Sequence, residues 1–352
     1  MNSRTERKRR LGALGSVWCG ALLCVGLLAP SAALASSPRH LKIYLVNRPA
    51  ATPQLVIYGG SRSQKAEPAV LERLTGIPGF NIASSSTQPS DVLAFATYLH
   101  DRNPEQRQFP LWFLSIEVFR RDDLFDRELL TMPELMDKIP PELKEGVKLS
   151  PPISFTPPAD LVFPDGLVWR PDGSLKVSHY DLVLRNGGTR EQMLIPRIKQ
   201  FVTNYDKFKT LSPTQMRMFE ATLARMNSYK WVPVILLPPY STELMAVMKQ
   251  HGYEARHKEA MEYLADLQLH YKFVVIDFSS LSSFGGWSDG LFDGIHGSTE
   301  LMRFMLKKVV AKSGSAFDPA VPYSIPPAAR YYSAPFSSLP FSTPPGEESQ
   351  LP

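Results

Sequence analysis

Cysteine is nearly absent from this chain of 352 residues, and its two cysteines, Cys19 and Cys24, both lie within the first 35 residues. That segment has the features of an export signal, and the chain that follows it contains no cysteine. Disulfide bonds, thiol catalysis and cysteine-held metal are therefore excluded from a mature protein that has lost the segment.

Patterns that hold metals or phosphate cofactors are also lacking. Gly59-Gly60 is not followed by the Gly-Lys-Ser/Thr sequence of a phosphate-binding loop. Apart from His296, the histidines are scattered, and none pairs with another at metal-ligand spacing on one helix face. We therefore expect no metal and no cofactor. The scattered histidines are His40, His100, His179, His251, His257 and His270.

The chain carries little net charge beyond its first residues. Its net charge is +5, but residues 1–35 contain five basic side chains and one acidic one, which leaves +1 for the rest. No basic stripe follows, so the composition gives no sign of a nucleic-acid partner. The charged residues of the first segment are Arg4, Glu6, Arg7, Lys8, Arg9 and Arg10.

Residues 1–35 have the order of features that is typical of an export signal. A basic start is followed by an uncharged stretch from Leu11 to Ala35, which ends in the small-x-small pattern Ala33-Leu34-Ala35. Neither cysteine has the context of a lipoprotein signal. The stretch is also long enough to stay attached as a membrane anchor. The protein is thus expected outside the cytoplasm, either periplasmic or held to the membrane through residues 11–35.

The other end of the chain has a different composition. Nine prolines and many serines lie between residues 317 and 352, with no helical period. This composition predicts a disordered tail over residues 316–352. Residues 36–315 are left as one domain.

Within this domain, short apolar runs alternate with helical patterns. This alternation predicts an α/β fold, a three-layer sandwich with a mainly parallel sheet. The expected strands are Leu55–Tyr58, Phe80–Ala83, Pro110–Val118, Trp231–Leu237 and Phe273–Phe278. The expected helices lie at 67–74, 91–99, 189–227 with a break near Leu211–Pro213, 242–250, 255–267 and after His296.

Two segments depart from this alternation. Leu41–Val46 alternates weakly, which favours a short extended segment. Residues 119–188 are irregular and rich in proline, and Pro171-Asp172-Gly173 at the centre of Leu167–Val177 is typical of a hairpin turn. We interpret residues 119–188 as an insertion lying over the sheet.

Two short motifs at opposite ends of the domain carry the chemistry. Gly59-Gly60-Ser61 follows the first buried run, and Asp293-Gly294-Ile295-His296 precedes the last helix. A serine that attacks a carbonyl needs a base such as His296, and a carboxylate such as Asp293 fixes the tautomer of that base. The N–H of Ser61, at the start of the following helix, is a candidate oxyanion donor supported by the helix dipole.

These motifs resemble those of the SGNH (GDSL-like) hydrolase and acyltransferase superfamily. The resemblance implies that Ser61, within Gly59-Gly60-Ser61-Arg62, is the nucleophile and that Asp293 and His296 complete a catalytic triad. The family's second block corresponds to Phe80–Ser86, where Ser86 stands in place of an oxyanion-donating glycine. Gly60 and Ser86 are accordingly candidate oxyanion residues. The third block lacks the family's Asn, because Phe113-Leu114-Ser115-Ile116-Glu117 stands there.

Four further residues have competing interpretations. Arg62 is either a ligand for an anionic substrate group or a solvated side chain at a helix start. Asn81 is either a site residue or an amide that anchors a loop. Glu117, at the end of the third expected strand, is either a site residue or a structural hydrogen-bond acceptor, because an ionised carboxylate cannot donate. Trp287 lies six residues before Asp293 and is a candidate for substrate contact.

The layout also resembles that of one exported branch of the superfamily. This resemblance rests on three short segments, Asp172-Gly173, Tyr205-Asp206-Lys207-Phe208 and Pro238-Pro239. Proteins of that branch handle acyl groups on cell-envelope polysaccharides, including alginate and teichoic acids. The resemblance implies a serine-dependent esterase or O-acyltransferase that acts on a small acyl ester or an acylated polysaccharide. Two alternatives remain open: a non-catalytic glycan-binding protein, and an accessory subunit that partners a membrane acyltransferase.

Overall fold

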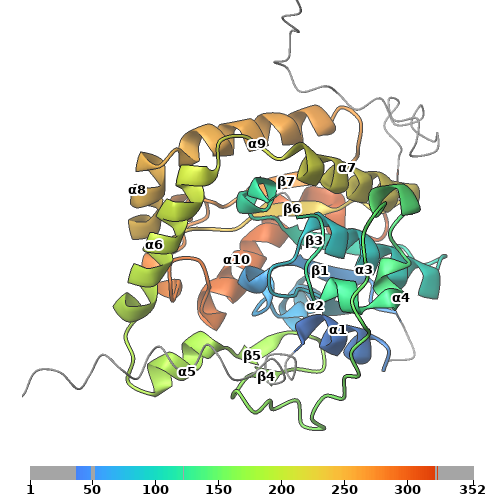
Figure 1. Cartoon of the computed structure of the whole chain (residues 1–352), viewed down its shortest axis with the longest axis horizontal. Coiled ribbons are helices and arrows are strands. Elements are labelled where there is room, and N and C mark those ends of the chain that lie inside the picture. Colours follow the sequence, from blue (N-terminus) through green and yellow to red (C-terminus); the bar gives the residue numbers. More distant parts are fainter. Residues whose placement is uncertain (1–36, 49–51, 122, 322, 324–352) are drawn as a thin grey trace, which may run out of the picture.

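The computed structural model describes residues 37–48, 52–121, 123–321 and 323, and Figure 1 shows helices on both sides of a central sheet. The sheet has five strands in the order β2-β1-β3-β6-β7, and every neighbouring pair is parallel. This is the flavodoxin-like order, in which ligands bind beyond the carboxyl ends of the strands. The strands are β1 (Leu55–Gly59), β2 (Gly79–Asn81), β3 (Phe109–Phe113), β6 (Val234–Leu237) and β7 (Val274–Asp277).

Successive residues of a strand point to opposite faces of the sheet. Because consecutive residues of β1 are apolar, both faces of the sheet are apolar there. Leu55 and Ile57 belong to one buried cluster, and Val56 and Tyr58 belong to the other. The predicted three-layer α/β sandwich is confirmed. The first cluster includes residues of α2 (Pro68–Thr75) and α10 (Thr299–Lys312), and the second includes residues of α1 (Pro38–Val46), α3 (Pro89–Arg102), α6 (Arg190–Lys207), α7 (Pro213–Ser228), α8 (Thr242–Gln250) and α9 (Tyr253–Leu267).

The irregular region contains short elements and the predicted hairpin. Strand β4 (Val168–Trp169) pairs antiparallel with β5 (Leu175–Val177) across a turn in which Gly173 has a φ of 79°. The buried Lys42 of α1 donates to the carbonyl oxygens of Asn81, at the end of β2, and Gly173. The hairpin is thereby held against the sheet. The helices of this region are α4 (Pro133–Met136) and α5 (His179–Arg185).

The extended segment expected at Leu41–Val46 is wrong, because these residues are the main part of helix α1. Pro38 occupies the first turn, where its missing N–H costs nothing. Leu41 and Leu45, four residues apart, lie on one helix face and are both buried. A run this short fits a helical period as well as a strand period, and packing against the sheet decides between them.

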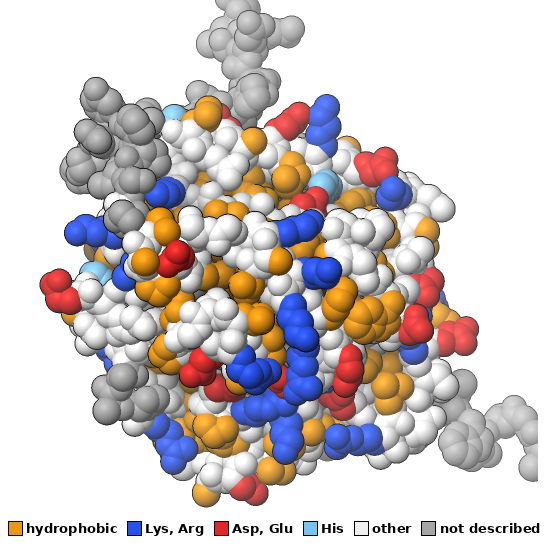
Figure 2. All heavy atoms as spheres, turned by 180° about the vertical axis from the view of Figure 1, so that it is seen from behind, with side chains coloured by type: hydrophobic (Ala, Val, Ile, Leu, Met, Phe, Trp, Pro, Cys, Tyr) orange, Lys and Arg blue, Asp and Glu red, His pale blue; other side chains and the backbone are white. Residues whose placement is uncertain are grey.

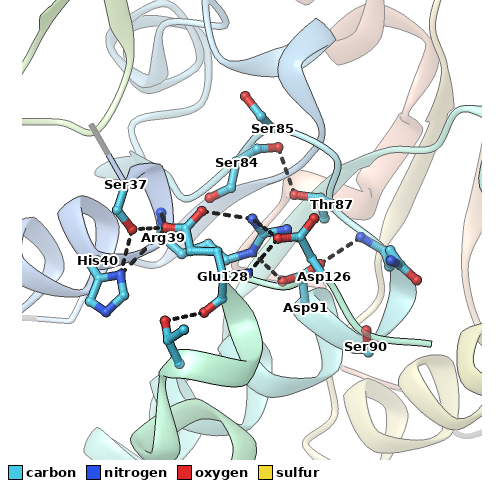
Figure 3. A network of polar contacts seen from close by, with 12 residues as sticks. Ser37, Arg39, His40, Ser84, Ser85, Thr87, Ser90, Asp91, Asp126 and Glu128 are labelled. Carbon is cyan, nitrogen blue, oxygen red and sulfur yellow. Dashed lines mark hydrogen bonds and ion pairs between the residues drawn. The ribbon is translucent and has the colours of Figure 1, made fainter. Parts of the chain in front are cut away.

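Arg39 joins helix α1 to the rest of the domain through a buried polar network, shown in Figure 3. Its side chain is 1% exposed, and its Nε and Nη2 atoms donate to the Asp91 carboxylate over 2.6 and 3.1 Å. Its Nη1 atom lies 3.0 Å from oxygens of both Asp126 and Glu128. One guanidinium thus serves carboxylates from α3 and from the segment that follows η2 (Ile116–Arg120).

We expect the substitution Arg39→Met to lower the free energy of unfolding by about 3–5 kcal/mol, because the volume is kept while Asp91, Asp126 and Glu128 lose their cation. Urea denaturation followed by circular dichroism measures this change. Arg48→Met is the control, since Arg48 is exposed and lies just after the same helix, and a surface change is worth about 0.5 kcal/mol or less. Equal stability of the two variants would contradict a stabilising role for the network.

The chain ends lie largely outside the described residues. These include the predicted export signal, residues 1–35, and residues 324–352 of the predicted tail. Gly314–Phe317 forms a 3₁₀ turn in which Ala316 and Phe317 are buried. In the described part of the chain, no helix combines the length and the apolar character that crossing a membrane requires. Figure 2 shows Lys and Arg gathered in one area of the face opposite Figure 1, beside acidic and hydrophobic side chains.

Candidate active site

Ser61 lies just beyond the carboxyl end of β1, where Gly59 forces the chain to turn. Gly59 has a φ of 139°, and a Cβ atom there would lie 2.6 Å from Ser63 Oγ and 2.9 Å from Phe113 Cβ. Only glycine is tolerated in such a position. The chain then forms the 3₁₀ turn η1 (Ser61–Ser63), with Ser61 partly exposed at its start.

Asn81 anchors this turn through hydrogen bonds to its main chain, and it does not line the pocket described below. Its side chain is fully buried, and its Nδ2 donates to the carbonyl oxygens of Ser63 and Ala66 over 2.8 Å each. Its Oδ1 accepts from the N–H of Ala83 over 2.9 Å. These contacts agree with the interpretation of Asn81 as a loop anchor.

The Asp293–His296 turn is closed by its own hydrogen bonds. The N–H of Phe292 donates to the His296 carbonyl over 2.8 Å, and the N–H of His296 donates to Asp293 Oδ1 over 3.0 Å. Gly294 has a φ of 94°, and its carbonyl accepts from the N–H of Ser241. The turn therefore presents both side chains in one direction.

Ser61, His296 and Asp293 form a continuous row of hydrogen-bonded side chains. Ser61 Oγ lies 2.8 Å from His296 Nε2, and His296 Nδ1 lies 3.0 and 2.9 Å from the two carboxylate oxygens of Asp293. Asp293 is 1% exposed and His296 is 7% exposed. The network assigns the proton on Nδ1 to the Asp293 bond, which leaves Nε2 to accept from the serine hydroxyl.

The charges around this row favour a neutral histidine and an ionised aspartate. Burial alone would raise the pKa of Asp293, but the hydrogen bond and charge of His296, with the Arg197 guanidinium, hold that pKa well below its usual range. Burial lowers the pKa of His296; Asp293 opposes this shift, while the positive charges of Arg197 and Arg62 add to it. At neutral pH His296 is therefore a base that is free to accept a proton.

Two residues that the sequence analysis did not identify contact Asp293 and His296. Arg197 of α6 donates from Nε to Asp293 Oδ2 over 2.7 Å, and from Nη2 to the Tyr180 hydroxyl over 2.9 Å. Tyr180 of α5 stacks on the His296 ring, with centroids 4.5 Å apart. Arg197 stood inside a correctly predicted helix, but no sequence signal says which turn of that helix faces the site.

Ser61 and Ser86 line the same pocket, and their main-chain N–H groups are candidate oxyanion donors. Within the described part of the chain, the N–H groups of Ser61 and Ser86 donate to no protein acceptor. Ser86 has a φ of 55°, the left-handed conformation that glycine adopts most readily.

The helix dipole expected to support the N–H of Ser61 is wrong, because η1 spans only three residues and α2 begins only at Pro68. A macrodipole acts within the first turn of its own helix.

Ser61 opens into a pocket of about 220 Å³ at the carboxyl end of the sheet, lined also by Gly60 and Ser86. Glu117 lies in this pocket too, but not at a strand end as expected. Strand β3 stops at Phe113, and Glu117 belongs to the 3₁₀ helix η2. Its Oε1 accepts from the hydroxyls of Tyr205 and Tyr240 over 2.7 Å each.

Arg62 also lines the pocket, yet the interpretation as a solvated side chain is wrong. It is 7% exposed, and its Nη2 donates to the carbonyl oxygens of Pro238 and Pro239. Its guanidinium lies 4.3 Å above the Tyr240 ring. Trp287, by contrast, is 40% exposed, packs near Phe304 and is not among the residues lining the pocket.

The site has no evident metal ligands, since the described residues contain no cluster of three His, Cys, Asp or Glu side chains able to hold an ion. The sequence matches no known protein family and no curated protein.

Proposed function

We propose that this protein is an extracytoplasmic serine-dependent esterase or O-acyltransferase that forms an acyl-enzyme on Ser61. The observation that carries the proposal is the row of hydrogen bonds from Ser61 Oγ through His296 to Asp293, with distances of 2.8, 3.0 and 2.9 Å. Such a row activates a hydroxyl that is otherwise a weak nucleophile. The pocket beside Ser61 has room for a small acyl group such as acetyl.

In the first half-reaction, Ser61 Oγ attacks the ester carbonyl carbon while His296 Nε2 takes the hydroxyl proton. The carbonyl oxygen becomes an oxyanion, for which the N–H groups of Ser61 and Ser86 are the available donors. When the carbon–oxygen bond of the ester breaks, the departing alkoxide takes the proton from His296. The products of this step are an alcohol and acyl-Ser61.

In the second half-reaction, a hydroxyl group attacks acyl-Ser61 and gives its proton to His296, which returns it to Ser61 Oγ. Water as the attacking group makes the protein an esterase. A sugar hydroxyl, such as that of a cell-envelope polysaccharide, makes it an O-acyltransferase. Both reactions use the same three side chains, so the acceptor distinguishes them.

Labelling with a serine-directed fluorophosphonate tests the proposal. We expect one adduct on the folded protein, located at Ser61 by mass spectrometry, because the probe needs a serine activated by a neighbouring base. Ser61→Ala and His296→Ala should block labelling. Ser280→Ala should not, because Ser280 is exposed and does not line the pocket.

A wild-type protein that stays unlabelled, and that does not hydrolyse small esters, would rule out the catalytic proposal. The working hypothesis would then be a non-catalytic glycan-binding protein or an accessory subunit of a membrane acyltransferase. Co-purification with membranes, with residues 11–35 still attached, would favour the accessory subunit.

A further inference from the structure

Among the described residues, the pocket beside Ser61 is lined by four arginines, Arg62, Arg120, Arg121 and Arg197, and by a single carboxylate, Glu117. Two of these arginines have ionic partners of their own. Arg197 pairs with Asp293, and Arg121 pairs with Asp123. The charge balance of the pocket therefore depends on Arg62, Arg120 and Glu117.

Glu117 and Arg62 contact the same tyrosine, Tyr240. The Glu117 carboxylate accepts from the Tyr240 hydroxyl, and the Arg62 guanidinium lies over the ring of the same tyrosine. Arg62 is also held by two main-chain carbonyl oxygens and by Ser115 Oγ. Its Nη atoms are thus occupied by protein acceptors, while its Nε is buried without a hydrogen-bond partner among the described residues.

Arg120 has no anionic partner in the part of the chain that the structure describes. It lies three residues after Glu117 on the 3₁₀ helix η2, a spacing that brings side chains to the same side of such a helix. Even so, no carboxylate of the described residues lies within ion-pair distance of Arg120, and its Nε is buried without a hydrogen-bond partner. A guanidinium carries five donors, and leaving one of them buried and unpaired is unfavourable.

We propose that Arg120 binds an anionic group of the substrate, so that the pocket selects esters bearing a carboxylate or a phosphate. An arginine that lines a pocket and lacks a protein counter-ion suits such a group, since its planar donors match both anions. The inference deepens the proposed function, because it names the class of ester that Ser61 attacks.

The test compares the effect of Arg120→Gln on matched anionic and neutral esters. p-Nitrophenyl hemisuccinate has a carboxylate on its acyl group, and p-nitrophenyl butyrate is its neutral counterpart; 4-carboxyphenyl acetate and phenyl acetate place the charge on the alcohol side. We expect Arg120→Gln to lower kcat/KM about tenfold or more for at least one anionic ester, through KM, because a charge-assisted hydrogen bond is lost. The neutral esters should change less than about twofold. Arg73→Gln, an exposed substitution on α2, should affect neither class.

Equal effects of Arg120→Gln on anionic and neutral esters, or no effect on either, would overturn the inference and leave the proposed function intact. Failure of the wild type both to hydrolyse any ester and to react with the fluorophosphonate would instead remove the proposed function. Calorimetric titration with monomethyl succinate and with methyl phosphate then decides the inference separately. Binding to the wild type that weakens about tenfold in Arg120→Gln supports it, and absent or unchanged binding overturns it.

Discussion

Replacing Ser61 or His296 by alanine is expected to lower kcat/KM for p-nitrophenyl acetate by about three orders of magnitude or more. Ser61 supplies the bond-forming oxygen, and His296 Nε2, 2.8 Å away, supplies the base. No other side chain of the row can act as the nucleophile or as the base. The initial rate of p-nitrophenolate release, measured on the purified protein at pH 7, gives the comparison.

The double variant distinguishes a catalytic unit from two independent contributions. Residues that act as one unit lose their whole effect with the first substitution, so Ser61→Ala/His296→Ala should be about as slow as either single variant. Ser280→Ala serves as the unaffected control, and far-ultraviolet circular dichroism checks that each variant is folded. Wild-type rates in both single variants would contradict the assignment of Ser61 and His296.

The two ends of the candidate site were predictable because each is a local pattern with a fixed place in the fold. An apolar run that stops at Gly59-Gly60 puts Ser61 at the carboxyl edge of a parallel sheet. The four-residue Asp293–His296 turn presents its side chains together without help from distant residues. Once the order of strands and helices predicts a parallel sheet, the two motifs are expected at the same edge, and Ser61 and His296 do lie within hydrogen-bond distance.

The residues that surround the row were not predictable, since their roles depend on tertiary packing. Tyr180 and Arg197 come from α5 and α6, and their approach to His296 and Asp293 depends on how these helices pack over the edge of the sheet. The same limitation explains Arg62, which the sequence could not show to be buried against Pro238-Pro239. Sequence patterns identify which chemistry is available, while packing decides which charges face one another.

Asp293→Asn is expected to lower kcat by about 10³- to 10⁴-fold, because an amide cannot hold His296 in the tautomer that accepts a proton at Nε2. Arg197→Gln should have a smaller effect, about tenfold, since it removes one charged donor from a carboxylate that keeps three other partners. Those partners are the main-chain N–H groups of Ile295 and His296 and the Nδ1 of the His296 ring.

The pH dependence of kcat/KM separates an electrostatic role of these residues from a purely structural one. Only neutral His296 accepts the serine proton, so activity rises with pH through the pKa of His296. Burial and the charges of Arg197 and Arg62 lower that pKa, and the acid limb of the wild type should therefore lie below the ordinary histidine value of about 6.5.

The two variants should move this limb in opposite directions. Arg197→Gln removes a positive charge that disfavours the imidazolium, so the pKa of His296 rises and the limb moves to higher pH. Asp293→Asn removes the negative charge that favours the imidazolium, so the pKa falls further and the limb moves to lower pH. Arg197→Lys keeps the charge and should leave the limb near its wild-type position. A limb that stays in place in both Arg197→Gln and Asp293→Asn, despite lower rates, would show that Arg197 and Asp293 support the site by packing alone.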